Sequence, residues 1–134
     1  MKSRFAFVMI ALIAASEPAL GERDLIPSLD NEPDVCVDRP TEPEWMQTIG
    51  IREAYTRVLV QDIYRAQNTE RIVATGTCAC VTRFPAWDAA EAEFRERFAS
   101  TERWEMLEAS AAYNRRANAL RPEAIAICET MGNW

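Results

Sequence analysis

Histidine is absent from the 134-residue sequence, and lysine occurs once, at Lys2. Without histidine the chain cannot form a Ser/His/Asp triad, a Cys/His nucleophile pair, a histidine metal or haem site, or an imidazole pH switch. The four glycines form no phosphate-binding loop, and there is no Cys-x-x-Cys-His haem motif. We therefore expect no cofactor and no metal.

Basic residues are also few, 15 against 21 acidic ones, so the net charge is -6. Nucleic acids and anionic membrane surfaces bind basic patches, and an acidic chain is a poor partner for either. The hydrophobic content of 49% is that of a globular domain rather than a disordered chain. The composition thus predicts one globular domain that binds no nucleic acid.

The N-terminus has the order of charges and apolar residues typical of a signal peptide. Lys2 and Arg4 precede an uncharged apolar run, Phe5 to Ala15, which is shorter than the roughly 20 residues of a membrane-spanning helix. Ala19 and Gly21 are small residues placed as a signal peptidase requires. We expect residues 1–21 to be cleaved after Gly21, with no stable membrane span left and a periplasmic or secreted destination.

Cleavage would change the charge and composition of the protein. Lys2, Arg4 and Glu17 are two basic residues and one acidic residue, so without them the net charge of -6 becomes -7. The only lysine is lost as well, which excludes Ser/Lys dyads, Schiff bases and lysine phosphate loops. The preference for arginine and alanine is typical of GC-rich bacterial genomes and favours the periplasm.

All four cysteines lie beyond residue 21, and an even number in a small exported protein predicts two disulfides. A bridge between Cys78 and Cys80 would be strained, because only Ala79 separates them. We expect Cys36 to pair with one of these two cysteines and Cys128 with the other. A redox-active pair and a four-thiolate zinc site are the alternatives, but the spacing suits neither.

Residues 22–41 contain three prolines, several acids and little apolar periodicity, which predicts an extended arm before a helical domain at 42–134. Thr41 and Glu44 fit a capping box for a helix that reaches Gln67. We expect Asn68 and Thr69 to interrupt it before a continuation that ends at Gly76. The helix has two apolar faces, one with Ile51, Tyr55, Val58, Leu59 and Ala66 and one with Met46, Ile49, Val60 and Tyr64.

The rest of the chain predicts a loop at 77–82 and three further helices. The first covers about 86–99 and carries two acid-first ion pairs, Glu91–Arg95 and Glu93–Arg97. The next begins after Ser100 or Thr101 and ends near Leu120. Pro122 then starts a helix that ends at Met131 and Gly132. No segment alternates with the period of a strand, so the fold class is all-α: a small bundle of three to four helices with an extended N-terminal arm and two disulfides.

The helix that ends near Leu120 has two apolar stripes, which we interpret as a sign of extensive packing. One stripe holds Trp104, Leu107 and Ala111, and the other holds Met106, Ala109, Tyr113, Ala117 and Leu120. Trp104 and Trp87 are predicted to be core residues. Trp45 and Trp134 are candidates for binding a partner, because aromatic residues are enriched at interface hot spots. Val60 and Tyr64 are further candidates, because they lie on the second apolar face of the first predicted helix.

One carboxylate stands out as a candidate acid or base. Asp62 falls on the first apolar face, where a carboxylate is unusual, although an arginine or a tyrosine hydroxyl as its partner would make it structural. Glu102, Glu105 and Glu108 form an acidic ridge, which without a binding loop is typical of a solvated helix face.

These features favour an exported, disulfide-stabilised helical module that binds another envelope protein and is not an enzyme. One setting that would suit it is an envelope-spanning secretion or conjugation apparatus. The competing class is a hydrolase of envelope glycans that uses only carboxylates, Asp62 and a neighbouring glutamate, which would have to face one cleft about 5–9.5 Å apart.

Overall fold

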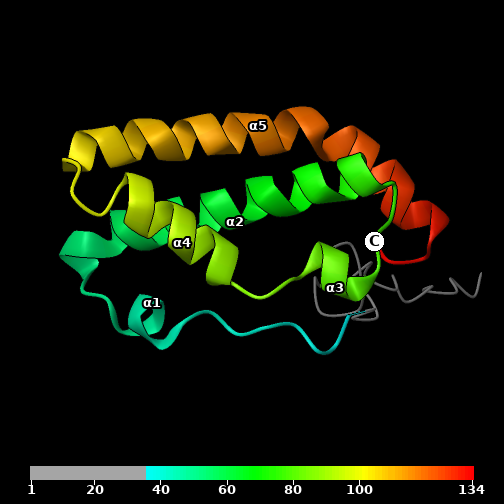
Figure 1. Cartoon of the computed structure of the whole chain (residues 1–134), viewed down its shortest axis with the longest axis horizontal. Helices are drawn as coiled ribbons and strands as arrows, with labels where there is room; N and C mark the ends of the chain where they lie inside the picture. Colours follow the sequence, from blue (N-terminus) through cyan, green and yellow to red (C-terminus); the bar gives the residue numbers. More distant parts are fainter. Residues whose placement is uncertain (1–35) are drawn as a thin grey trace, which may run out of the picture. The chain divides into compact units, whose positions relative to one another are not determined.

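A computed structural model describes residues 36–134 of the chain (Figure 1). The predicted signal peptide, and the predicted arm as far as residue 35, lie outside these residues. The described part is helical and contains no strand. The predicted all-α class with two disulfides is confirmed. In chain order the elements are α1 (Glu44–Thr48), the 3₁₀ turn η1 (Ile51–Glu53), α2 (Ala54–Thr75), α3 (Cys80–Arg83), α4 (Asp88–Arg97) and α5 (Arg103–Thr130).

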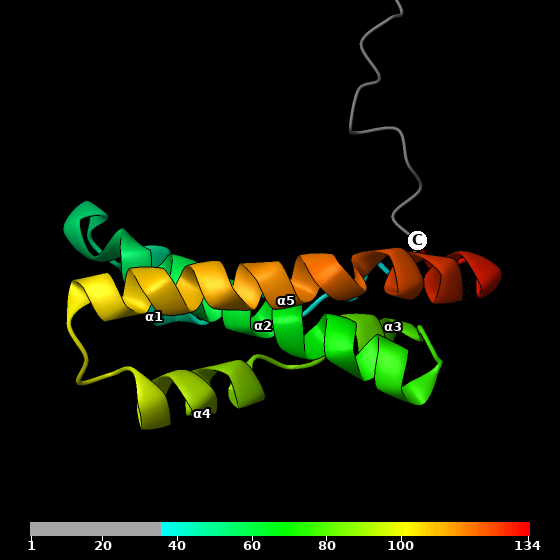
Figure 2. The same cartoon turned by 90° about the horizontal axis from the view of Figure 1, so that it is seen from above.

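The two long helices, α2 and α5, lie side by side and run in the same direction (Figures 1 and 2). Thr56 lies 4.0 Å from the sulfur of Met106 near their first turns. Cys78, just after α2, is bonded to Cys128 in the last turns of α5. A parallel pair needs a return connection, and α3 and α4 supply it, with α4 running back towards the start of α2 (Figure 1).

The main core lies where α2 meets α5 on one side and α4 on the other. Of the α2 side chains, Leu59, Val60, Ile63 and Ala66 are completely buried. Both apolar faces predicted for this stretch therefore contribute to the core, since Leu59 and Val60 come from opposite ones. The remaining buried members of this core are Met46, Ala90, Phe94, Met106, Tyr113 and Ala117.

A second, smaller core closes the other end of the helix pair and contains one of the disulfides. Ile72 and Cys78 pack there against Ala124 and Cys128. The two bridges are Cys36–Cys80 and Cys78–Cys128, with Cα atoms 5.5 and 4.9 Å apart. They resolve the pairing that the sequence left open, and none of the described cysteines is free.

The first predicted helix is wrong in its N-terminal half. The chain is extended at Ile49 and Gly50, which separates α1 from η1 and α2. The predicted capping box is absent, since Pro43 precedes α1 without a side-chain cap. Glu42 instead accepts hydrogen bonds from Arg57, at 2.9 Å, and from Gln61 on α2. This contact holds the segment before α1 against the helix that was expected to continue from it.

Two further corrections concern α2 and the segment after it. α2 continues through Asn68, because the Asn68 side chain is buried and accepts a 3.5 Å hydrogen bond from Arg71 instead of competing for the backbone. The helix ends as predicted at Gly76, which has a positive φ of 63°. The segment 77–82, predicted to be a loop, contains the first three residues of the short helix α3.

The last two predicted helices are one continuous helix. Pro122 lies inside α5 and is exposed. Because proline has no backbone N–H, the carbonyl of Asn118 receives no helical hydrogen bond from it. The exposed position lets this carbonyl bond to water instead. The final turns of α5 bend towards α3 (Figure 1). At the other end the cap is Glu102 rather than Ser100 or Thr101, because Glu102 and Glu105 form a capping box.

Removing the Cys78–Cys128 bridge should destabilise the fold strongly. The bridge closes 50 residues, for which loss of chain entropy predicts about 4 kcal/mol. The Cys36–Cys80 bridge closes 44 residues, for which chain entropy predicts nearly the same amount, but its cysteines lie outside both cores, whereas Cys78 and Cys128 are completely buried in the smaller one. Guanidinium unfolding of Cys78→Ala/Cys128→Ala and Cys36→Ala/Cys80→Ala should show the larger loss in the first variant. Equal losses would contradict this difference between the two bridges.

Candidate functional site

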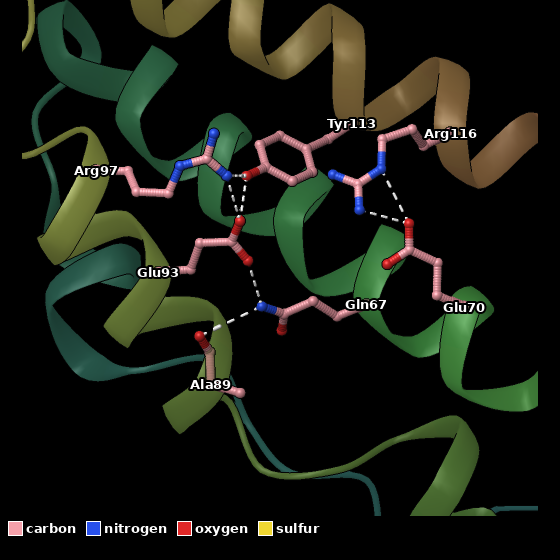
Figure 3. Close-up of polar contacts among 7 residues, drawn as sticks. All are labelled: Gln67, Glu70, Ala89, Glu93, Arg97, Tyr113 and Arg116. Carbon is pink, nitrogen blue, oxygen red and sulfur yellow. Dashed lines mark hydrogen bonds and ion pairs between the residues drawn. The ribbon is translucent and has the colours of Figure 1, made fainter. Parts of the chain in front are cut away.

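The most connected polar cluster joins α2, α4 and α5 around Glu93 (Figure 3). Gln67 donates to one Glu93 oxygen at 2.7 Å and to the Ala89 carbonyl at 3.4 Å. Arg97 and the hydroxyl of Tyr113 both donate to the other oxygen, the arginine at 2.7 Å. Arg97 also donates to the Tyr113 oxygen at 2.7 Å. The Tyr113 hydroxyl thus donates one hydrogen bond, to Glu93, and accepts another, from Arg97.

This environment changes the pKa values of both acidic groups in the cluster. Burial raises the pKa of Tyr113 to about 12, and the hydrogen bond to Glu93 acts in the same direction. Burial alone would raise the pKa of Glu93, but hydrogen bonds from Tyr113, Gln67 and Arg97 outweigh it and lower that pKa. Glu93 therefore stabilises the fold above its unfolded pKa, and this contribution is lost as the pH falls through its folded pKa.

The Glu93 cluster is built for structure rather than for acid–base chemistry. At neutral pH Glu93 is ionised and Tyr113 is protonated, so the phenol donates a hydrogen bond that the carboxylate accepts. Next to it, Arg116 on α5 pairs with Glu70 on α2 at 2.6 Å (Figure 3). The sequence analysis missed the cluster. The only local signal was the Glu93–Arg97 spacing, whose predicted ion pair is confirmed at 2.7 Å together with that of Glu91 and Arg95.

Asp62 lies at the edge of the α2–α5 contact, and its side chain is 13% exposed. It accepts a hydrogen bond from Ser110 on α5 and lies 3.4 Å from Arg65 one turn further along α2. These are the partners of a structural carboxylate. Asp62 lines neither of the two hollows described below.

Tyr64 and Trp134, two of the four predicted partner-binding residues, line one hollow of about 190 Å³ between α2, α3 and α5. Tyr64 is held rigidly, since its ring stacks 3.8 Å from that of Trp87 and its hydroxyl donates to the Pro85 carbonyl at 2.7 Å. Burial raises its pKa, although hydrogen bonding to Asn68 opposes the change. The structure therefore brings these two distant aromatic residues to one site.

The other two predicted binding residues contribute to packing. Val60 is completely buried in the main core. Trp45 is half-buried, stacks on Phe94 with ring centres 6.0 Å apart, and donates from its indole to Glu91 at 2.8 Å. It thereby docks α1 on α4. Burial removes Val60 from the surface, whereas part of the Trp45 side chain remains exposed.

The first turns of α5 carry an exposed apolar stripe, which we define as Trp104, Leu107 and Ala111. Trp104 is 60% exposed and Leu107 is 48% exposed, so the prediction that Trp104 belongs to the core is wrong. The core is built from the other stripe, with Met106, Tyr113 and Ala117 buried. An open hollow beside the exposed stripe is lined by Trp104, Ala111, Arg115 and two members of the acidic ridge, Glu105 and Glu108.

Two features are absent from residues 36–134. No group of three or more cysteine, aspartate or glutamate side chains is placed to hold a metal ion. Among the same residues, no helix combines the length and the apolar character needed to cross a membrane. Comparison with models of protein families, with curated proteins and with solved structures finds no match to the chain.

Tyr113→Phe should destabilise the protein by about 1–3 kcal/mol, because the half-buried Glu93 carboxylate loses a donor and Arg97 loses an acceptor. Tyr55→Phe is the matched control. The Tyr55 ring lies 5.2 Å from Arg103, and its hydroxyl makes no hydrogen bond within the described part of the chain. That variant should stay within about 0.5 kcal/mol in urea unfolding. Equal losses would show that the Glu93 cluster does not stabilise the fold.

One tyrosine should ionise near pH 12, and Tyr113→Phe should remove that step from an ultraviolet absorbance titration. An unfolded phenol ionises near 10.0, so the folded state binds this proton more tightly. The resulting stabilisation is complete below pH 10 and is lost as the pH rises to about 12. Identical titrations of the wild type and the variant would contradict the assignment.

Proposed function

We propose that the chain is an exported, disulfide-stabilised helical module that binds another envelope protein and has no catalytic role. The observation that carries the proposal is the exposed apolar stripe of α5. Trp104 and Leu107 stand one turn apart on the face of α5 that does not contribute to the core, and they are 60% and 48% exposed. Large exposed apolar patches mark protein interaction sites.

The chemistry of the stripe suits a protein partner. Burial of apolar surface stabilises a complex by roughly 25 cal/mol per Å², and tryptophan is enriched among the residues that dominate binding energy. Glu105 and Glu108 beside the stripe provide the polar rim typical of such interfaces. An acidic rim favours a partner with basic residues around its own apolar contact.

Export is supported by the cysteines together with the first 21 residues. All described cysteines are paired, and such bridges persist in oxidising compartments. With the signal-peptide pattern of residues 1–21, this favours the periplasm or a secreted location. The disulfides would also let so small a domain keep its fold without a larger core.

A non-catalytic role is supported by the state of the titratable groups. Glu93 and Tyr113 are bonded to each other, and Asp62 is bonded to Ser110. The sequence offers no histidine and no lysine beyond residue 2 as a substitute base. A carboxylate enzyme that used Asp62 and a neighbouring glutamate would need both side chains facing one cleft, and Asp62 lines neither of the two hollows described above.

Photo-crosslinking in the native envelope tests the proposal. A photoreactive phenylalanine analogue at position 107 should form an adduct with one envelope protein, and Trp104→Ala in the same chain should reduce the yield by about tenfold or more. The same analogue at position 81 is the control, because Val81 is 74% exposed but lies on α3, outside the stripe.

The result has clear alternatives. No adduct from position 107, or equal adducts from positions 107 and 81, would contradict binding through the stripe. An adduct with the mass of two copies would show self-association in place of a separate partner. The thermal midpoint of Trp104→Ala should match that of the wild type, since the indole is largely exposed and lies outside both cores.

A further inference from the structure

The outward face of α5, turned away from the core, has two opposite charges without a partner in the described chain. Glu108 and Arg115 are exposed and line the same open hollow beside the exposed stripe. Neither side chain makes an ion pair or a hydrogen bond within residues 36–134, whereas the neighbouring Arg116 is paired with Glu70. The two charges are two helical turns apart, so they point the same way at a separation of about 10 Å. They are therefore too distant to pair with each other.

The surface between the two charges is small and apolar. Ala111 and Ala112 lie midway between them and line the same hollow. Trp104 lies one turn before the first charge and is 60% exposed, and Ala119 lies one turn after the second and is also exposed. α2 packs along the opposite side of α5, and no described element lies above α5 in Figure 1. Because alanine side chains are short, another helix can approach this face closely.

This face is complementary in charge to a reversed copy of itself. A two-fold axis that crosses α5 between Ala111 and Ala112 would place Arg115 of a second copy opposite Glu108, and Glu108 of that copy opposite Arg115. Such reciprocity is the property of an isologous interface. A parallel pair would instead bring each charge next to its own kind, which is unfavourable. The charges thus favour an antiparallel pair of α5 helices.

The same register also covers the large apolar side chain of the face. Trp104 of each copy would lie over Ala119 of the other, where the small side chain leaves room for the indole. Burial of the indole stabilises the pair, while exposed ion pairs contribute less to affinity and mainly fix the register. Contact along one helix of each copy is at the low end of interface sizes, which is typical of weak and transient complexes.

We propose that the outward face of α5 binds the same face of a second copy in a weak antiparallel dimer, held in register by two reciprocal Glu108–Arg115 ion pairs. The dimer covers Trp104, so it excludes the envelope partner from the exposed stripe. This competition rests on the proposed function, whereas the self-association does not. At low concentration the dimer dissociates and leaves the stripe free for the partner.

Sedimentation equilibrium of the native, disulfide-bonded protein between about 10 µM and about 1 mM tests the proposal. The wild type should show a reversible equilibrium between monomer and dimer. Glu108→Arg and Arg115→Glu each place like charges opposite each other, and each should weaken association by about tenfold or more. The double variant Glu108→Arg/Arg115→Glu restores both ion pairs in exchanged order and should associate like the wild type.

Glu129→Arg is the matched control. It makes the same change of charge as Glu108→Arg at an exposed residue of the same helix, but position 129 lies beyond the reach of the paired α5 in this register. Its association should equal that of the wild type. A monomer at every concentration, single variants that associate like the wild type, or a double variant that stays dissociated would overturn the antiparallel pair.

The two proposals for this face can fail separately. A dimer in the purified protein together with no adduct from position 107 in the envelope would contradict the separate partner and leave the self-association standing. A protein that stays monomeric but still gives the adduct would contradict the self-association alone.

Discussion

The parallel packing of α2 and α5 is the constraint on which the rest of the fold depends. Two parallel helices cannot be joined by a tight turn, so the chain must return along their length, and α4 makes that return. The return also covers the second face of α2, which explains why Leu59 and Val60 are both completely buried. Covalent and polar contacts then fix the arrangement at two places. Cys78–Cys128 joins the ends of the pair, and the Glu93 cluster bonds α4 to both long helices.

The return path leaves α5 covered on one side only, and this asymmetry produces both candidate binding surfaces. At its start, the core uses Met106 and leaves Trp104 and Leu107 in solvent. At its end, Arg121 and Ala124 of α5 line the hollow together with Trp134. The exposed stripe is apolar and has an acidic rim, whereas the hollow combines side chains of α2, α3 and α5.

Features set by local sequence were predictable, whereas features set by packing were not. The all-α class, the end of α2 at Gly76 and the participation of all four cysteines in two bridges follow from periodicity, backbone freedom and cysteine number. The choice between the two stripes of α5 does not, because both are equally apolar and only the position of α2 decides which is buried. For the same reason Trp104 was misplaced. The hollow joins residues up to 70 positions apart, from Tyr64 to Trp134, which no local pattern relates.

The disulfide pairing tests the parallel arrangement most directly. Cys78 and Cys80 are separated by one residue, so the partner of each is set by how the end of α2 faces α5. Mass spectrometry of unreduced peptides, with backbone fragmentation at Ala79, assigns the two bridges. The account predicts no free thiols, with Cys128 on Cys78 and Cys36 on Cys80. Cys128 joined to Cys80, or free thiols in the native protein, would contradict it.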